Sequence, residues 1–288
     1  IDYVRLNTIH RQAYDSNIIS LAHSINNEVI PTDILKVYPD RMFVEENTDN
    51  FQTRLISSIQ YLLNQGFDLY EDIQILIPMY RGNTGIDSVN KLIQETFNPN
   101  KTKAIIYGDR EFRIGDKVIQ LSNQVEDNVM NGDQGIVIGI TEEKQLIVDF
   151  LGNEVSYKLG DLINLKHAYA MSIHKSQGSE YKVVILPIFR SYSIMLKRKL
   201  LYTAITRAKE KLILIGDISA LKYGVERTEA SRQSVLKELI INKILSNNKT
   251  DIKKTEVKRK KINDSSIPFE YLGEEINEEL SPYDFMDK

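Results

Sequence analysis

Two polar runs, each followed directly by a strongly apolar run, decide the fold of this chain. Residues 172–181 read SIHKSQGSEY and precede KVVILPI at residues 182–188. Residues 201–210 read LYTAITRAKE and precede KLILIG at residues 211–216. Short apolar runs rich in β-branched residues are typical of strands buried in a parallel sheet. The hydroxyl, ammonium and guanidinium groups beside them are suited to binding phosphate.

The composition is that of a globular protein without disulfides. The chain has 288 residues, 42% of them hydrophobic and 27% charged, with a net charge of −3 and no cysteine. The absence of cysteine excludes disulfides and thiolate zinc sites, and it fits a reducing compartment. No apolar run approaches the ~20 residues that a membrane span needs. We therefore expect a cytoplasmic protein that does not bind membranes, and a first residue other than Met suggests an excised fragment.

The first hundred residues alternate between helical and strand patterns. Apolar residues recur at helical spacing from Ile18 to Ile25, with Ser16 or Asp15 as the predicted cap, and again from Ile56 to Leu63. Residues 72–78 predict a buried strand, which a glycine-containing loop joins to a helix at residues 86–97. Strand, loop and helix in this order indicate an α/β fold with a parallel sheet.

The pattern changes to short strands between about residues 110 and 162. Strand candidates occupy residues 117–121, 135–140, 145–150 and 154–157, and turn residues separate them. Such spacing predicts a small β-barrel inserted into the α/β lobe. We expect lobe residues 1–109 and 163–220, the insertion at 110–162, and a C-terminal helix and charged tail at 221–288. The tail is either solvated or a docking segment for a protein partner.

The two opening runs resemble the last two signature motifs of superfamily 1 helicases, in the form found in RecD-like helicases (the exodeoxyribonuclease V alpha subunit family). The resemblance implies a RecA-like lobe with an inserted small β-barrel. No Gly-x-x-x-x-Gly-Lys-Ser/Thr run occurs, so the phosphate-binding loop of an ATP motor is missing from this chain. The resemblance therefore implies the second half of a two-lobed DNA motor. ATP with Mg²⁺ would bind jointly with an N-terminal lobe of the same protein.

The resemblance also implies which residues meet the nucleotide. Arg207 takes the place of the arginine finger, and Arg11, within LNTIHRQ at residues 6–12, is the second arginine that reaches the γ-phosphate. Gly178 and Glu180 are the expected triphosphate and ribose contacts, with Gln177 beside them. The alternative for each arginine is an ordinary ion pair with an acidic neighbour. The four histidines lack metal-site spacing, so we expect no metal site of the chain's own.

A second set of residues is expected to contact single-stranded DNA. Residues 78–85, PMYRGNTG, resemble a family segment that binds the DNA backbone, and free N–H groups at the start of the next helix favour a phosphate there. The alternative is a plain turn. In this segment and the helix after it, the residues predicted to contact DNA are Arg81, Asn83, Thr84 and Asn90. In the motif that starts at residue 172, they are Ser172, His174 and Lys175.

The β-patterned insertion bears on the direction of movement. By resemblance, a small barrel at this place implies 5′→3′ movement on single-stranded DNA, and the alternative is a barrel that stiffens the lobe or binds a protein. The leading hypothesis is thus the C-terminal motor lobe of an ATP-dependent helicase that is inactive without its N-terminal lobe. A non-catalytic module that binds single strands or a protein is the other hypothesis. No acidic cluster supports a nuclease.

Overall fold

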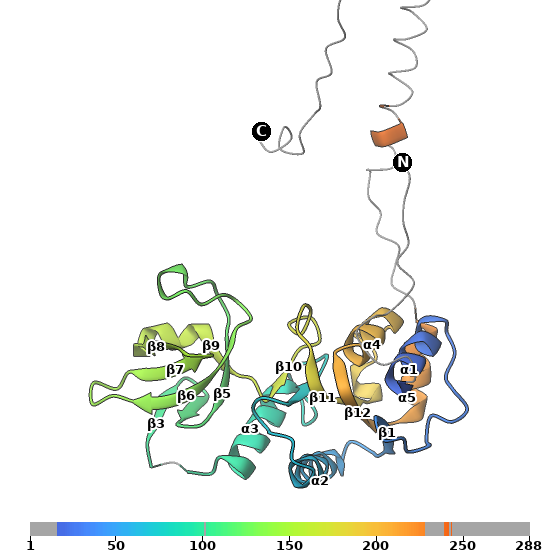
Figure 1. Cartoon of the computed structure of the whole chain (residues 1–288), viewed down its shortest axis with the longest axis horizontal. Coiled ribbons are helices and arrows are strands. Elements are labelled where there is room, and N and C mark those ends of the chain that lie inside the picture. Colours follow the sequence, from blue (N-terminus) through green and yellow to red (C-terminus); the bar gives the residue numbers. More distant parts are fainter. Residues whose placement is uncertain (1–15, 101, 228–238, 242, 244–288) are drawn as a thin grey trace, which may run out of the picture. The chain divides into compact units, whose positions relative to one another are not determined.

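A computed structural model describes residues 16–100, 102–227, 239–241 and 243 (Figure 1). Its central element is a five-stranded sheet in the order β1-β12-β11-β2-β10, in which all neighbouring strands are parallel. The strands are β1 (Arg41–Glu45), β12 (Ala208–Gly216), β11 (Tyr181–Ile188), β2 (Ile73–Leu76) and β10 (Ala170–Met171). The two apolar runs that follow the polar motifs are β11 and β12, adjacent in the middle of the sheet. The predicted α/β class with a parallel sheet is confirmed.

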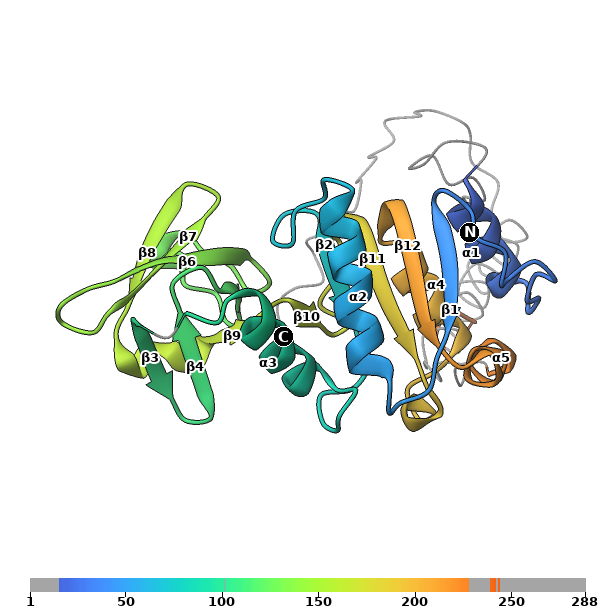
Figure 2. The same ribbon diagram turned by 90° about the horizontal axis from the view of Figure 1, so that it is seen from below.

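Helices cover both faces of this sheet, as Figure 2 shows. One group comprises α1 (Asn17–Asn26), α4 (Arg198–Ile205) and α5 (Ile218–Glu226); α4 contacts both of the others, and all three contact the central strands. The other comprises α2 (Phe51–Asn64) and α3 (Ile86–Phe97). Each helix turns an apolar stripe toward the sheet. The predicted cap of α1 is confirmed, because the Ser16 hydroxyl accepts a hydrogen bond from the N–H of Ile18.

The β-rich part of the chain, residues 104–167, forms two antiparallel sheets. The strands β3 (Ala104–Tyr107) and β4 (Arg110–Arg113) form a hairpin. The larger sheet has the order β8-β7-β6-β5-β9. Its strands are β5 (Lys117–Gln120), β6 (Gln134–Ile140), β7 (Leu146–Phe150), β8 (Asn153–Tyr157) and β9 (Leu165–His167). Short 3₁₀ turns occupy Val125–Asp127 and Leu159–Asn164 in this part of the chain, and a third, Arg190–Tyr192, follows β11. The four strands expected between residues 117 and 157 are present as β5 to β8, while the predicted domain bounds stay a prediction.

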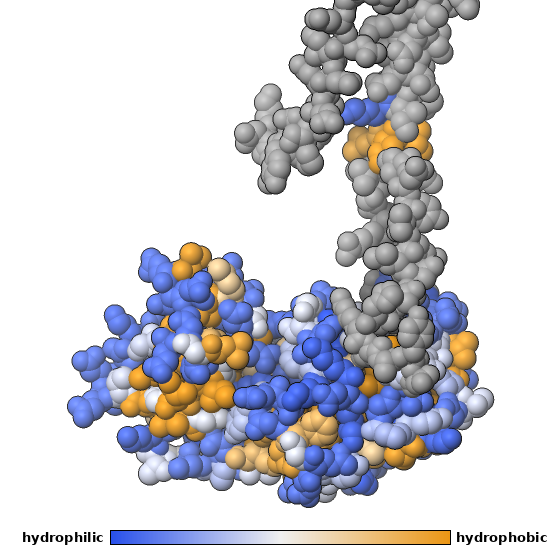
Figure 3. All heavy atoms as spheres, in the orientation of Figure 1, coloured by the Kyte–Doolittle hydropathy of each residue, from blue (hydrophilic) through white to orange (hydrophobic). Residues whose placement is uncertain are grey.

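The β-rich part has a hydrophobic core of its own, and strand β5 contributes to both cores. Val118 packs among the β-rich residues, and its neighbour Ile119 packs into the core of the parallel sheet. Successive side chains of a strand point to opposite faces, so one short strand ties the two cores together. Figure 3 shows apolar side chains at the surface of the β-rich part, where Val125 and Leu151 are among the most exposed.

The chain divides into two units, residues 1–230 and 231–288. In the second unit, residues 239–241 and 243 are helical and fall within the C-terminal helix and tail expected at residues 221–288. The predictions for the rest of the charged tail lie outside the described residues. No helix in the described ranges has the length and apolar content to cross a lipid bilayer.

Candidate nucleotide and nucleic-acid site

The motif at residues 172–180 connects two strands that run in the same direction. Met171 in β10 lies level with Leu76 of β2, whereas Val183 in β11 lies level with Ile73. Because β10 and β11 are both parallel to β2, the connection has to return from the carboxyl edge of the sheet to its amino edge. Leu76 lies three positions beyond Ile73 in β2, and β11 starts at Tyr181, two positions before Val183. The return therefore spans about five residue positions, or roughly 17 Å at ~3.3 Å per residue. We call residues 172–180 the crossing segment.

The crossing segment is anchored by two buried residues and turns its polar residues outward. Ile173 and Ser176 are almost fully buried, and the Ser176 hydroxyl donates to the carbonyl of Ile173 at 2.8 Å. His174, Gln177 and Gly178 are exposed. Gly178 has φ of +90°, and a Cβ there would meet no other atom within 4 Å. Within this chain, the left-handed backbone is therefore the reason that residue 178 is glycine.

Arg207 lies between α4 and β12 and contacts the end of the crossing segment. Its Nη1 donates to the carbonyl of Ser179 at 2.9 Å, and its Nε donates to the carbonyl of Thr203 at 3.1 Å. A third, longer contact of 3.5 Å runs from Nη2 to the hydroxyl of Thr206. Because a guanidinium has five N–H groups, two remain without a partner among the described residues. The half-exposed side chain is thus oriented by this chain and keeps donors for an anion.

Of the other residues predicted to contact nucleotide, Gln177, Gly178 and Glu180 lie in the described part of the chain. Glu180 directly precedes β11 and forms an ion pair with Lys209 at 3.2 Å. Gln177 is exposed, and its N–H donates to the carbonyl of His174 at 3.2 Å within the turn. The structure therefore places Glu180 and Arg207 at the amino edge of the sheet, and Gln177 and Gly178 in the turn that precedes Glu180 in the chain. Arg11 lies outside the described residues, so its place relative to Arg207 stays a prediction.

The loop after β2 is closed by its own backbone. A Cβ on Gly85 would lie 2.4 Å from the carbonyl oxygen of Tyr80, so only glycine fits there. The N–H groups of Ile86 and Asp87, at the start of α3, donate to the carbonyls of Met79 and Tyr80 at 3.0 and 3.2 Å. The expectation of free N–H groups at these two positions is therefore wrong. The loop satisfies these two groups internally, so neither is available to a phosphate.

The predicted DNA contacts separate into exposed and buried residues. Arg81, Asn83 and His174 are exposed, and Lys175 is half-buried. Thr84, Asn90 and Ser172 are buried.

Asn90 on α3 has both of its amide atoms occupied. Its Nδ2 donates to the carbonyl of Ala170 at 2.9 Å, and its Oδ1 accepts from the Ala170 N–H at 2.8 Å. Asn90 therefore completes the edge strand β10 as a neighbouring strand would. The amide group of Asn90 is thus already paired within the fold.

Sequence reasoning missed a buried polar cluster around Asp116, where the β-rich part meets α3. Gln94 and the Arg113 N–H donate to one carboxylate oxygen, at 2.6 and 2.7 Å. Asn98 and the Tyr169 hydroxyl donate to the other, at 2.9 and 3.0 Å. His167 Nε2 lies 3.2 Å from the carboxylate. These residues are far apart in sequence and match no short motif.

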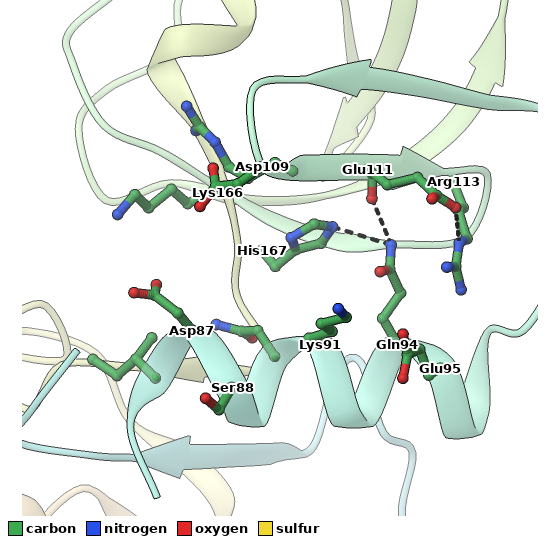
Figure 4. A pocket seen from close by; sticks show the side chains of 13 residues that line it. Asp87, Ser88, Lys91, Gln94, Glu95, Asp109, Glu111, Arg113, Lys166 and His167 are labelled. Carbon is green, nitrogen blue, oxygen red and sulfur yellow. Dashed lines mark hydrogen bonds and ion pairs between the residues drawn. The ribbon is translucent and has the colours of Figure 1, made fainter. Parts of the chain in front are cut away.

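A pocket of about 610 Å³ lies between α3, β4 and β9 (Figure 4). Its lining mixes the four acids Asp87, Glu95, Asp109 and Glu111 with the four cations Lys91, Arg110, Arg113 and Lys166. Such a balance selects neither an anion nor a cation. Within the described part of the chain, no group of three or more His, Asp or Glu side chains could hold a metal ion.

Comparisons with known protein families agree with this architecture. Residues 89–150 match the family described as "ATP-dependent RecD-like DNA helicase SH3 domain", and residues 167–215 match "UvrD-like helicase C-terminal domain". The chain belongs to the RecD-like helicases. The first match contains strands β3 to β7, and the second contains the crossing segment, Arg207 and most of β12. The predicted resemblance is thus confirmed.

Curated relatives of this RecD-like chain are longer proteins. It is 32% identical over 239 residues to the ATP-dependent RecD2 DNA helicase of Deinococcus radiodurans, which covers 82% of this chain and 32% of that protein. It is 28% identical to the RecBCD enzyme subunit RecD of Buchnera aphidicola, covering 74% of this chain and 38% of that protein. The chain thus spans about a third of the length of these relatives. Among solved structures, Bacteroides Pif1 bound to single-stranded DNA aligns with a TM-score of 0.47 and 14% identity, over 84% of this chain and 56% of that one.

Proposed function

We propose that this chain is the second motor lobe, with its β-rich part, of an ATP-dependent helicase that moves 5′→3′ on single-stranded DNA. The observation that carries the proposal is the contact between Arg207 and Ser179, which joins the two polar motifs at one edge of the sheet. Family membership supports the same conclusion. The two relatives described above are named as an ATP-dependent DNA helicase and a RecD subunit, and the chain matches about a third of their length.

The residues around Arg207 fit a nucleotide that is held mainly by another lobe. Arg207 keeps two N–H groups for a phosphate oxygen, and Glu180 supplies a carboxylate suited to a ribose hydroxyl. ATP with Mg²⁺ supplies the phosphoryl group whose transfer would drive movement. The phosphate-binding loop, the magnesium ligands and the group that positions water would come from an N-terminal lobe. Arg207 would stabilise the charge that develops on the γ-phosphate only when the two lobes close.

The crossing segment supports a way to link nucleotide state to DNA contact. Its first residues, Ser172 to Lys175, lie by the carboxyl end of β10, and its last residues lie beside Arg207. A displacement of Ser179 when Arg207 engages phosphate would thus be carried along the segment to His174 and Lys175. Together with Arg81 and Asn83, these two residues are the proposed backbone contacts to single-stranded DNA.

The experiment that tests the motor assignment is DNA-stimulated ATP hydrolysis by the longer protein that contains this chain. Replacing Arg207 by Ala is expected to lower kcat about 10³-fold or more, with ATP binding largely kept. Arg207→Lys should rescue little, because an ammonium lacks the planar fork that matches phosphate oxygens. The matched control is Arg54→Ala, which removes an exposed arginine that pairs with Glu46 on the surface.

The outcome that contradicts the proposal is an Arg207→Ala protein with unchanged turnover and an unchanged melting temperature. The chain would then be a binding module for single strands or for a protein. Direction is a separate measurement: unwinding of a duplex with a 5′ single-stranded overhang, and none of a duplex with a 3′ overhang, is expected. The reverse preference would remove the 5′→3′ assignment and leave the motor assignment standing.

A further inference from the structure

A small apolar pocket opens at the carboxyl edge of the parallel sheet, away from Arg207. Its volume is about 290 Å³, and it lies where the loop after β2, strand β9 and the crossing segment meet. The lining includes the buried side chains of Ile119, Ala170 and Met171. A cavity with apolar walls and few polar groups at its rim is suited to a flat, weakly polar ring.

An exposed aromatic ring stands at this pocket. Tyr80, from the loop after β2, lines the pocket with 41% of its surface exposed. The Nζ of Lys166 lies 5.1 Å from the centroid of its ring. Exposed aromatic rings beside cationic groups are the platforms on which single-stranded nucleic acids stack their bases. Tyr80 therefore has the chemistry and the exposure to receive a base.

Two lysines at the same pocket are not paired with any carboxylate in the described part of the chain. Lys166 from β9 and Lys175 from the crossing segment both line the pocket. Neither forms an ion pair with any acidic residue that the structure describes. Partial burial, together with the positive charge of Lys166, lowers the pKa of Lys175. Two cations held this close destabilise each other, and an anion between them removes that repulsion.

We propose that this pocket holds one nucleotide of single-stranded DNA, with its base stacked on Tyr80 and its phosphate between Lys166 and Lys175. The inference rests on the proposed function and adds to it a base-contacting residue and a contact from the β-rich part. ATP is a poorer occupant of this pocket, because Arg207 lies at the opposite edge of the sheet. A DNA strand bound in this pocket would contact both the crossing segment and β9.

The test measures binding of the 288-residue chain to a fluorescent oligothymidylate by anisotropy at low salt. Tyr80→Ala is expected to weaken binding by between about fivefold and about 150-fold, the value of one base stacked on one ring. Tyr80→Phe should bind like the wild type, because the ring is kept. Tyr61→Ala is the matched control, since Tyr61 is 44% exposed and lies beneath Lys211 in the same way, but on α2.

Two further readouts separate stacking from a general structural effect. An oligomer of abasic residues should bind equally to wild type and Tyr80→Ala, because no base is present to stack. The second readout is the slope of log affinity against log salt concentration. Lys166→Gln should reduce the magnitude of this slope by about 0.7 for each phosphate that the lysine neutralises. Tyr80→Ala should leave the slope unchanged. Lys36→Gln is the control, as this lysine also lies over a tyrosine ring, 5.0 Å from Tyr38.

Each outcome decides the inference independently of the motor assignment. Equal affinity of wild type and Tyr80→Ala for oligothymidylate would overturn it, as would a Tyr80→Ala defect that persists on the abasic strand. No measurable binding of either strand by the wild-type chain at low salt would overturn it too. ATP turnover that depends on Arg207 would still support the motor in all three cases. A Tyr80-dependent affinity together with Arg207-independent turnover would keep the pocket and remove the motor.

Discussion

At the scale of single residues, similar side chains in the predicted site have very different surroundings. Asn83 is exposed in the loop after β2, whereas Asn90 is buried on α3 with both amide atoms paired to Ala170. The spacing of apolar residues in α3 is enough to predict that Asn90 is buried. Asn90 follows Ile86 by four positions and precedes Ile93 by three, so it shares the apolar face. Resemblance to a motif assigned both asparagines to DNA, while helical geometry separates them.

The two asparagines therefore give opposite expected results on substitution. Asn90→Ala should lower the free energy of unfolding by about 2–4 kcal/mol, because it leaves the buried N–H and carbonyl of Ala170 unpaired. Asn83→Ala should change stability by less than about 0.5 kcal/mol, as is usual for exposed positions, and should weaken DNA binding. Urea unfolding followed by circular dichroism measures the first effect. An Asn90→Ala protein of wild-type stability would contradict the structural role.

At the scale of elements, the β7–β8 turn carries visible backbone strain. Phe150 pairs with Asn153, so Leu151 and Gly152 form a two-residue turn with φ of +55° and +92°. Both angles are those of a type I′ turn, which favours Asn-Gly. Leu151 is a non-glycine residue in the left-handed region, and its side chain is fully exposed. The turn holds because strands β7 and β8 fix its ends and the Gly152 N–H donates to the Asp149 carboxylate at 2.6 Å.

Relieving this strain should stabilise the β-rich part. Leu151→Asn is expected to raise the free energy of unfolding by about 0.5–1 kcal/mol, since asparagine tolerates positive φ and removes an exposed apolar side chain. Leu151→Ala is the control, because alanine keeps the unfavourable backbone angle. Thermal and urea unfolding compare the variants. Equal stabilisation by both substitutions would show that the exposed leucine, and not the backbone angle, is the cause.

Elements were predictable where they were long enough to show a period. Strands β5 to β8 have alternating or apolar runs with turn residues between them. The two long central strands, β11 and β12, are predicted by their continuous apolar runs. By contrast, β9 and β10 have three and two residues, too few to show alternation. The hairpin of β3 and β4 was not predicted, although its strands have four residues each, as β5 does. The crossing segment was identified as a motif, but its path depends on the pairing of β10 with β2, which only tertiary structure gives.

At the scale of the whole 1–230 unit, buried polar groups join the parallel sheet to the β-rich part. The Asp116 carboxylate accepts from Gln94 and Asn98 in the α3 region, and from Tyr169 before β10. Buried Lys117 adds a second link, because its Nζ donates to the carbonyl of Ile73 in β2 at 3.3 Å, and burial lowers its pKa to about 8. Neither link was predictable, since each needs partners that are distant in sequence.

Acidity should weaken this junction through Asp116. Burial favours the protonated form of Asp116. The hydrogen bond and the positive charge of His167 oppose this, as do the hydrogen bonds from the Arg113 N–H and from Asn98, and together they hold the pKa of Asp116 below its usual value. A lowered pKa means that the stabilisation is complete above about pH 4 and is lost as pH falls through the folded-state pKa. Asp116→Asn should destabilise by about 3 kcal/mol at pH 7, because an amide brings donors where donors already converge.

The measurement is urea unfolding at several pH values between neutral and strongly acidic. The wild type is expected to lose stability faster than Asp116→Asn below about pH 4, so the two should converge. Asp87→Asn is the matched control, since Asp87 is an exposed acid on α3. Parallel pH profiles of wild type and Asp116→Asn would show that this carboxylate does not link acidity to stability.

The return path of residues 172–180 sets a limit on how this sequence can vary. Both ends of that stretch are tied to strands of fixed register, and nine residues must cover the distance between them. Nine extended residues reach about 30 Å, so a path of roughly 17 Å leaves slack that the turns of the segment take up. The limit is therefore a minimum length: one inserted or deleted residue can be accommodated in the turns, whereas fewer than about five residues could not keep both strands paired.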